Sequence, residues 1–149
     1  MIISTPNLNQ VRKEIQLAKK KGGLVIVKAQ DEEFNRKILE IPGVSVLLSP
    51  ELHNRKDYLK QRDSGLNEHL CKLAKKNNIK IAINIEEISK LDKKLKARIL
   101  ARIKQNIELC KRTGCQIIIW PEGKHKKQDI MAFFLTLKGS TQLGKKAGG

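Results

Sequence analysis

Short, continuously apolar segments alternate along this sequence with longer amphipathic ones. The apolar segments cover residues 24–28, 44–48, 79–85 and 115–120, and Ile2–Ile3 form a shorter one. Each is rich in β-branched residues over its whole length, as expected of a strand that is buried on both faces. Strands of this kind, separated by amphipathic helices, are typical of a parallel sheet covered by helices. The predicted fold class is therefore α/β.

The segments between these strands predict helices. Thr5 and Pro6 are expected as the N-cap and first residue of the first helix, which ends at Gly22. Further helices are predicted over residues 31–40, 66–76, 89–113 and 129–137. The longest opens with a capping box at Ser89–Asp92 and ends at Gly114. Its inner stripe is expected at Leu95, Ile99, Ile103 and Ile107, and its basic residues are expected outside, at Lys93, Lys94, Lys96, Arg98, Arg102 and Lys104.

Chain length limits the architecture. A complete (β/α)₈ barrel takes roughly 250 residues, or about 31 per βα unit. With 149 residues, this chain has room for about five units. It is expected to form either an open parallel sheet or part of a barrel. Residues 1–138 are predicted to be one domain, and the Gly/Lys-rich residues 139–149 a flexible basic tail.

The charge balance favours a polyanionic partner. Lys and Arg number 31 against 15 Asp and Glu, a formal net charge of +16. Such a domain gains free energy by neutralising phosphates and releasing their counterions. Only five aromatic side chains are present, so few bases could stack, and RNA would be bound through phosphates and shape. A merely solvated basic surface is the alternative. No stretch approaches the roughly 20 apolar residues of a membrane span, and a cytoplasmic location is expected.

Catalytic and metal-binding patterns are scarce. The sequence contains neither a phosphate-binding P-loop nor a dinucleotide-binding glycine motif. His53, His69 and His125 lie far apart, so they are interpreted as solvated or phosphate-contacting residues rather than metal ligands. Glu86–Glu87 follow a strand but are explained as the start of a helix. Cys71, Cys110 and Cys115 lack the spacing of a zinc site or disulfide framework and are expected to be buried and reduced. No catalytic residue, metal or cofactor is therefore expected in this chain.

Two basic loops follow predicted strands. One carries Arg55, Lys56, Lys60 and Arg62, and the other carries Lys124, Lys126 and Lys127 beside His125. Because both loops leave the carboxyl ends of parallel strands, they should emerge at the same edge of the sheet. Two cationic loops on one edge would form a phosphate-binding surface, and these seven residues are the predicted RNA contacts.

The segment after the first of these loops also suggests a helix start. Asp63 or Ser64 is expected to cap the following helix, with Gly65 allowing close packing and Asn67 in the first turn. Free N–H groups at a helix start beside Arg62 would bind an anion. Plain helix capping is an equally weighted interpretation.

These residues resemble protein component 3 of archaeal and eukaryotic ribonuclease P. The resemblance is carried by Asn35-Arg36, by residues 42–51 ending in Pro50-Glu51, and by the run Arg62-Asp-Ser-Gly-Leu-Asn67. Residues 73–77 and the strand 79–85 are similar as well. The similarity covers roughly residues 24–130. The family-motif positions taken over from it are Arg36, Pro50, Glu51, Arg62, Asp63, Gly65 and Asn67, which are expected to be partly structural.

The resemblance implies a TIM-barrel-like fold related to PHP phosphoesterases, without their metal site. It also implies a non-catalytic subunit that helps a catalytic RNA, which uses magnesium, to remove 5′ leaders from precursor tRNA. Expected partners are that RNA and a small RRM-like protein subunit. The chain departs from the family in its shorter length, with the missing part expected at the N-terminus, and in Ser45, where Asp is expected. An incomplete barrel exposes a sheet edge, so a partner chain or self-association is expected to cover it.

Two alternatives remain open. One is a general basic RNA-binding or ribosome-associated domain, which would keep the basic loops without needing residues 50–67. The other is a metal-dependent phosphoesterase of the PHP type, which would need clustered His and Asp residues at the strand ends.

Overall fold

The computed structural model describes residues 2–53 and 63–120. The first half of the fold contains β1 (Ile2–Ile3), α1 (Leu8–Lys21), β2 (Ile26–Lys28), α2 (Glu32–Leu39) and β3 (Val46–Leu48). The second half contains α3 (Glu68–Lys76), β4 (Lys80–Asn84), the short α4 (Ile85–Ser89), α5 (Lys93–Thr113) and β5 (Ile117–Trp120). The helix predicted over residues 129–137 and the tail from 139 lie outside the described residues.

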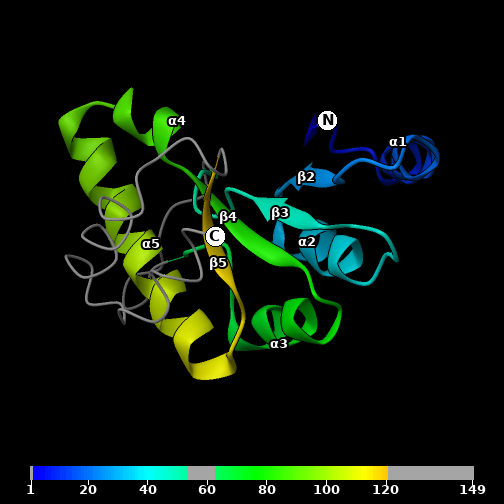
Figure 1. Cartoon of the computed structure of the whole chain (residues 1–149). Helices are drawn as coiled ribbons and strands as arrows, with labels where there is room; N and C mark the ends of the chain where they lie inside the picture. Colours follow the sequence, from blue (N-terminus) through cyan, green and yellow to red (C-terminus); the bar gives the residue numbers. More distant parts are fainter. Residues whose placement is uncertain (1, 54–62, 121–149) are drawn as a thin grey trace.

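The five strands form one sheet in the order β1-β2-β3-β4-β5, and every neighbouring pair is parallel. Each strand therefore lies next to the one before it, and no connection reverses direction. Right-handed crossovers that always step the same way place their helices on the same face of the sheet. Figure 1 shows α1, α2, α3 and α5 following one another around the sheet. This is the arrangement of a (β/α) barrel segment, and it confirms the predicted parallel, barrel-like α/β fold.

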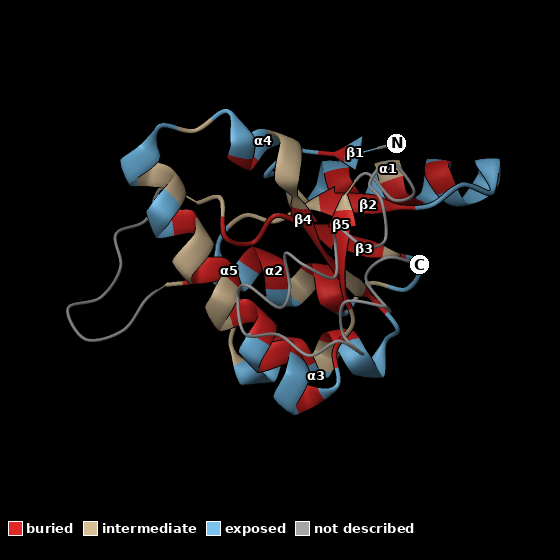
Figure 2. Cartoon of the chain, turned by 60° about the vertical axis from the view of Figure 1, so that its left-hand side comes forward, coloured by how far each residue is buried: buried red, intermediate tan, exposed pale blue. Residues whose placement is uncertain are grey.

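Alternating strand residues divide the apolar core into two parts. Val27, Leu47 and Ile81 face the helices and join the main cluster, together with Val11 and Ile15 of α1, Ile38 of α2, Leu70 of α3 and Ile103 of α5. The residues between them on the strands form a smaller cluster on the other face: Ile26, Val46, Leu48, Ala82 and Ile118. Figure 2 shows that the central residues of the strands are buried and that the helices turn exposed surfaces outward.

For α1 and α5, the observed C-terminal ends match the predicted ones, and the observed N-caps differ from the predicted ones. Gly22 and Gly114 end α1 and α5 in the left-handed conformation, as predicted. The predicted N-caps are wrong. Asn7, and not Thr5, caps α1, and Asp92 alone caps α5 because Ser89 is the last residue of α4. Several Asn, Asp, Ser and Thr residues near each start can cap, so composition alone does not select one.

The inner stripe of α5 is confirmed at Ile99, Ile103 and Ile107, which are buried, and Leu95 packs against the core. The prediction that Arg102 lies outside is wrong, because its side chain is buried. Within the described ranges, no helix is both long enough and apolar enough to cross a bilayer.

Candidate functional site

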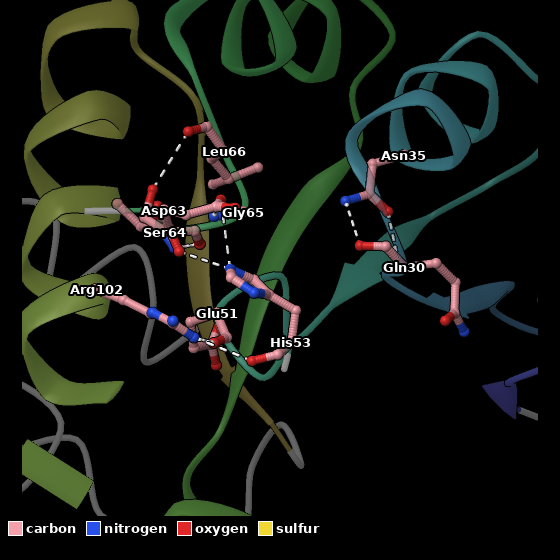
Figure 3. Close-up of polar contacts among 10 residues, drawn as sticks. Gln30, Asn35, Glu51, His53, Asp63, Ser64, Gly65, Leu66 and Arg102 are labelled. Carbon is pink, nitrogen blue, oxygen red and sulfur yellow. Dashed lines mark hydrogen bonds and ion pairs between the residues drawn. The ribbon is translucent and has the colours of Figure 1, made fainter. Parts of the chain in front are cut away.

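The polar residues that follow β3 gather at the carboxyl edge of the sheet. The chain leaves β3 at Ser49, runs through Glu51 and His53, and returns at Asp63 before α3 begins. We call residues 49–53 and 63–66 the loop base. Figure 3 shows that these two short segments lie side by side, next to α5. The loop base therefore sets where residues 54–62 leave and re-enter the described fold.

Two side chains of α5 hold the loop base. Arg102 donates through Nη1 to the carbonyl oxygens of Glu51 and His53, at 3.1 Å each. One turn further along, Asn106 donates through Nδ2 to the carbonyl oxygen of Ser64 at 3.1 Å. Arg102 and Asn106 are each only 1% exposed. The helix thus contacts both segments of the loop base, which lie about 50 and 40 residues away in the sequence.

The two segments also contact each other directly. His53 donates through Nε2 to the carbonyl oxygen of Asp63 at 2.6 Å, and the same nitrogen lies 3.4 Å from the Asp63 carboxylate. The side chain of His53 is only 7% exposed. The interpretation of His53 as a solvated residue is therefore wrong, because the imidazole closes the loop base.

The turn before α3 differs from the prediction. Asp63 and Ser64 do not cap the helix: Asp63 accepts from the Gly65 backbone N–H at 3.2 Å, and the Ser64 hydroxyl donates to the Leu66 carbonyl oxygen at 3.2 Å. The cap is Asn67, whose Oδ1 accepts from the Leu70 backbone N–H at 2.9 Å. Asn67 also donates to Glu32 at 2.9 Å, which joins the start of α3 to α2.

The carboxyl group of Glu51 is fully buried. Within the described part of the chain, neither of its oxygens has a hydrogen-bond partner. Burial, the largest cause, raises the pKa of Glu51 from 4.5 to about 8. The negative charge of Glu87 adds to this rise in pKa, and the positive charge of Arg102 opposes it. The carboxyl is therefore protonated at neutral pH, because the charged form cannot be solvated there.

We expect this carboxyl to make the fold less stable as pH rises. Between pH 4.5 and pH 8 the folded protein keeps the proton that the unfolded chain loses, so the free energy of unfolding falls, by at most about 1.4 kcal/mol per pH unit. Glu51→Gln stays neutral, so it should be less pH-sensitive than the natural protein over this range. Urea unfolding of both proteins at several pH values across this range measures the difference. Parallel pH profiles would contradict the prediction.

A pocket of about 450 Å³ opens at the same edge, beside the ends of β1 and β2. Its polar lining includes Ser4, Lys28, Gln30, Asp31 and His53. Asp31 caps α2 through the Phe34 backbone N–H. The buried Asn35 of α2 accepts from the Gln30 backbone N–H at 2.8 Å and donates to the Gln30 carbonyl oxygen at 3.3 Å (Figure 3). Asn35 therefore shapes this wall of the pocket, in which Lys28 and Asp31 place opposite charges.

The predicted RNA contacts lie outside the described residues: Arg55, Lys56, Lys60, Arg62, Lys124, Lys126 and Lys127. The described strands do support the geometric part of that prediction. β3 precedes the first basic loop and β5 the second, and both run parallel to β4, which lies between them. Both loops therefore begin at the carboxyl edge of the sheet.

Among the other family-motif positions, Arg36 of α2 is exposed, and its Nη1 lies 4.0 Å from Oε1 of Glu40, the C-cap of that helix. Pro50 and Glu51 are buried in the loop base. The sequence prediction missed Arg102 and Asn106. Both lie within the buried stripe of α5, beside Ile99 and Ile103, and this helical spacing was the signal that could have identified them.

The described residues contain no group of three or more His, Cys, Asp or Glu side chains that could hold a metal ion. Glu86 and Glu87 lie in the first turn of α4, as expected of a helix start. The PHP-type alternative requires a ligand cluster, and the described strand ends do not supply one.

Comparison with known proteins identifies the relatives of this fold. No protein-family model matches the chain. Ribonuclease P protein component 3 of Methanococcus maripaludis is 28% identical over 117 residues, which cover 78% of this chain and 47% of the relative. The same component of Methanocaldococcus jannaschii is 26% identical over 140 residues, covering 91% of this chain and 57% of the relative. The chain is similar to ribonuclease P protein component 3. It spans about half the length of these relatives.

Solved structures agree with this relationship. A chain in the cryo-EM structure of archaeal ribonuclease P with mature tRNA superposes with a TM-score of 0.80 at 26% identity, covering 98% of this chain and 62% of that one. A prolidase superposes with a TM-score of 0.62 at 11% identity, which shows a shared fold alone. The predicted resemblance to component 3 of ribonuclease P is thus confirmed.

Proposed function

We propose that this chain acts as a non-catalytic protein subunit of ribonuclease P, which assists RNA-catalysed removal of 5′ leaders from precursor tRNA. The observation that carries the proposal is the structural match to a chain of archaeal ribonuclease P, at a TM-score of 0.80 over nearly the whole of this chain. The net charge of +16 is consistent with it, because a subunit that reduces phosphate repulsion helps a large RNA hold its active fold. Magnesium would be bound by the RNA.

Reconstituted cleavage tests this function. Precursor-tRNA cleavage is measured with the cognate RNA and the other protein subunits, with and without this chain, over a magnesium titration. We expect the chain to raise the cleavage rate and to lower the magnesium concentration required. A general basic RNA-binding domain would bind the RNA without changing either quantity, and that result would refute the proposal.

The proposed RNA contacts are the two basic loops that begin at the carboxyl edge of the sheet. We expect the triple reversal Arg55→Glu, Lys56→Glu and Lys127→Glu to weaken binding to ribonuclease P RNA at moderate salt. It should also reduce the slope of log affinity against log salt by about one for each phosphate that the protein no longer neutralises. Filter binding over a salt series measures both quantities.

The matched control reverses the exposed Lys13, Lys20 and Lys21 of α1. It changes net charge equally, but α1 ends at the amino edge of the sheet, immediately before β2. An equal loss of affinity in both triple variants would show that only net charge matters and would contradict binding at the carboxyl edge.

The proposed protein partners are a small RRM-like subunit and a second copy of this chain. β1 lies at one end of the described strand order and pairs only with β2 among the described strands. Three large apolar residues in this part of the chain are 45–56% exposed: Ile2 of β1, Leu17 of α1 and Leu24 before β2. Covering them would remove apolar area from water. Size exclusion with light scattering, with and without the small subunit, should show a mass above the monomer. A stable monomer in both experiments would contradict this.

A further inference from the structure

Positive charge is concentrated at the start of α5, outside the two basic loops. Residues 89–98 contain five Lys or Arg and one Asp, a formal net charge of +4. Four of these cations are exposed and the last is partly exposed: Lys90, Lys93, Lys94, Arg98 and Lys96. We call these five residues the basic α5 surface. All five belong to the described part of the chain, and Figure 2 shows this end of α5 largely exposed.

The basic α5 surface lies at the carboxyl edge of the sheet. β4 ends at Asn84, and α4 and then α5 follow it directly, so α5 begins at this edge. Figure 1 shows the start of α5 beside α4 and away from α3. Arg98 lies one helical turn before Arg102, whose guanidinium holds the loop base. The surface is therefore next to the edge at which the two basic loops begin.

The placement of these cations is unfavourable for the helix itself. The start of a helix carries partial positive charge, so acidic residues stabilise it and basic residues do not. Three other helices follow this rule with acidic residues in their first turns: Glu32 and Glu33 in α2, Glu68 in α3, and Glu86 and Glu87 in α4. The first turn of α5 has no acidic residue and contains Lys93 and Lys94. Lys94 and Arg98 are also four residues apart, a spacing at which like charges repel.

No neighbouring carboxylate neutralises these charges. Exposed lysines on two other helices pair with a glutamate one turn earlier, at 3.2 Å in each case: Lys37 with Glu33 and Lys72 with Glu68. Within residues 2–53 and 63–120, none of the five cations of the basic α5 surface lies at ion-pair distance from a carboxylate. Asp92 is the N-cap of α5, and its carboxylate accepts from the Leu95 backbone N–H at 2.8 Å. The cations of this surface therefore face solvent and can contact an external anion.

We propose that the basic α5 surface binds the phosphate backbone of an RNA double helix, as a contact separate from the two basic loops; this inference rests on the proposed RNA-binding role. Lys94 and Arg98 line one groove of about 270 Å³ together with Asp92 and Leu95. They are about 6 Å apart along the helix axis, which is comparable to the separation of successive phosphates on a strand.

The residue types of this surface favour a duplex over unpaired bases. Residues 85–98 contain no aromatic side chain on which an unpaired base could stack. Lys and Arg side chains on a rigid helix suit the regular backbone of A-form RNA, which proteins recognise mainly through phosphates and 2′-hydroxyls. We therefore expect binding that depends strongly on salt and little on base sequence.

Fluorescence anisotropy of a labelled RNA duplex tests the proposal with the full chain, over a salt series. The α5 variant combines Lys93→Gln, Lys94→Gln and Arg98→Gln. Its matched control removes the same charge from the exposed side of α1: Lys13→Gln, Lys20→Gln and Lys21→Gln. We expect the α5 variant to bind about tenfold more weakly at moderate salt, with a salt slope reduced by up to about three. The control should lose no more than about twofold, because salt screens charges that do not contact the RNA.

Urea unfolding of the same variants separates binding from folding. Because the three replaced cations repel one another and lie at the positive end of α5, the α5 variant should be at least as stable as the natural protein. Weaker RNA binding without lost stability is the expected combination. If the α5 variant does not fold, Lys94→Gln alone provides the comparison, with Lys20→Gln as its control.

Two outcomes would overturn the proposal. Equal RNA affinity of the α5 variant and its control would show that the surface is only solvated. Tighter binding of the natural chain to single-stranded RNA or to polyglutamate than to the duplex would assign the surface to another ligand. Reconstituted cleavage distinguishes this inference from the proposed function. A chain that stimulates cleavage while its α5 variant binds RNA as the control does would refute the inference alone. Duplex binding that depends on the surface, without any effect of the chain on cleavage, would refute the function alone.

Discussion

Replacing Arg102 with methionine is expected to lower the free energy of unfolding by about 3 kcal/mol. The substitution preserves most of the aliphatic length but removes the guanidinium that donates to the carbonyl oxygens of Glu51 and His53. Both carbonyls would then lose their donor from α5 in a buried part of the loop base. Leaving a buried acceptor unsatisfied costs about 1–3 kcal/mol. Urea unfolding followed by circular dichroism measures the change.

Arg98→Met is the matched control for this prediction. Arg98 lies one turn earlier on α5 and is exposed, so its loss should change stability by no more than about 0.5 kcal/mol. Arg102→Lys tests the geometry, because a lysine keeps the charge but does not present the planar set of donors. We expect it to be destabilised nearly as much as the methionine variant. Equal stability of Arg98→Met and Arg102→Met would show that Arg102 does not support the loop base.

Gly65→Ala should be the second severely destabilising change, also by about 3 kcal/mol. Gly65 has φ of +85°, a conformation that costs a residue with a Cβ about 1–2 kcal/mol. In addition, a Cβ at this position would lie 1.9 Å from the Pro50 carbonyl oxygen. Because that atom belongs to the backbone, the two segments of the loop base would have to separate. Chemical denaturation of the variant measures the loss.

Gly22→Ala isolates the conformational part of this effect. Gly22 also has a positive φ, of +73°, but a Cβ there would meet nothing within 4 Å. We expect Gly22→Ala to cost only about 1 kcal/mol. If the two alanine variants lose equal stability, the close approach of Gly65 to Pro50 contributes nothing. If Gly65→Ala lowers RNA affinity while keeping its stability, Gly65 would have a role in binding instead of in folding.

The buried Glu51 makes the stability of the loop base depend on pH. Its carboxyl is protonated near neutral pH, and Arg102 donates to the backbone carbonyl oxygen of the same residue. Loss of the Glu51 proton would create a buried negative charge, which burial disfavours and the negative charge of Glu87 disfavours further. The loop base should therefore be the first part of this fold to loosen at alkaline pH, which amide hydrogen exchange can resolve residue by residue.

Local patterns in the sequence determined the fold. The continuous apolar segments predicted parallel strands, and the five observed strands lie inside or at those segments. Helical spacing predicted the buried face of α5, and Gly22 and Gly114 predicted two helix ends. The strands, the buried helix face and the helix ends all follow from the periodicity and backbone preferences of residues that are close in the sequence. They can therefore be predicted without knowing the tertiary contacts. The shared edge of the two basic loops followed from parallel strands alone.

Only the tertiary structure decided which polar residues serve the fold. Arg102 is one of many basic residues on α5, and its burial depends on carbonyl groups about 50 residues away. Asn67 is the cap of α3 because Asp63 is engaged by His53 and Gly65. A charged or polar side chain is equally compatible with solvent and with a buried partner, and contacts between distant segments determine which of the two it finds.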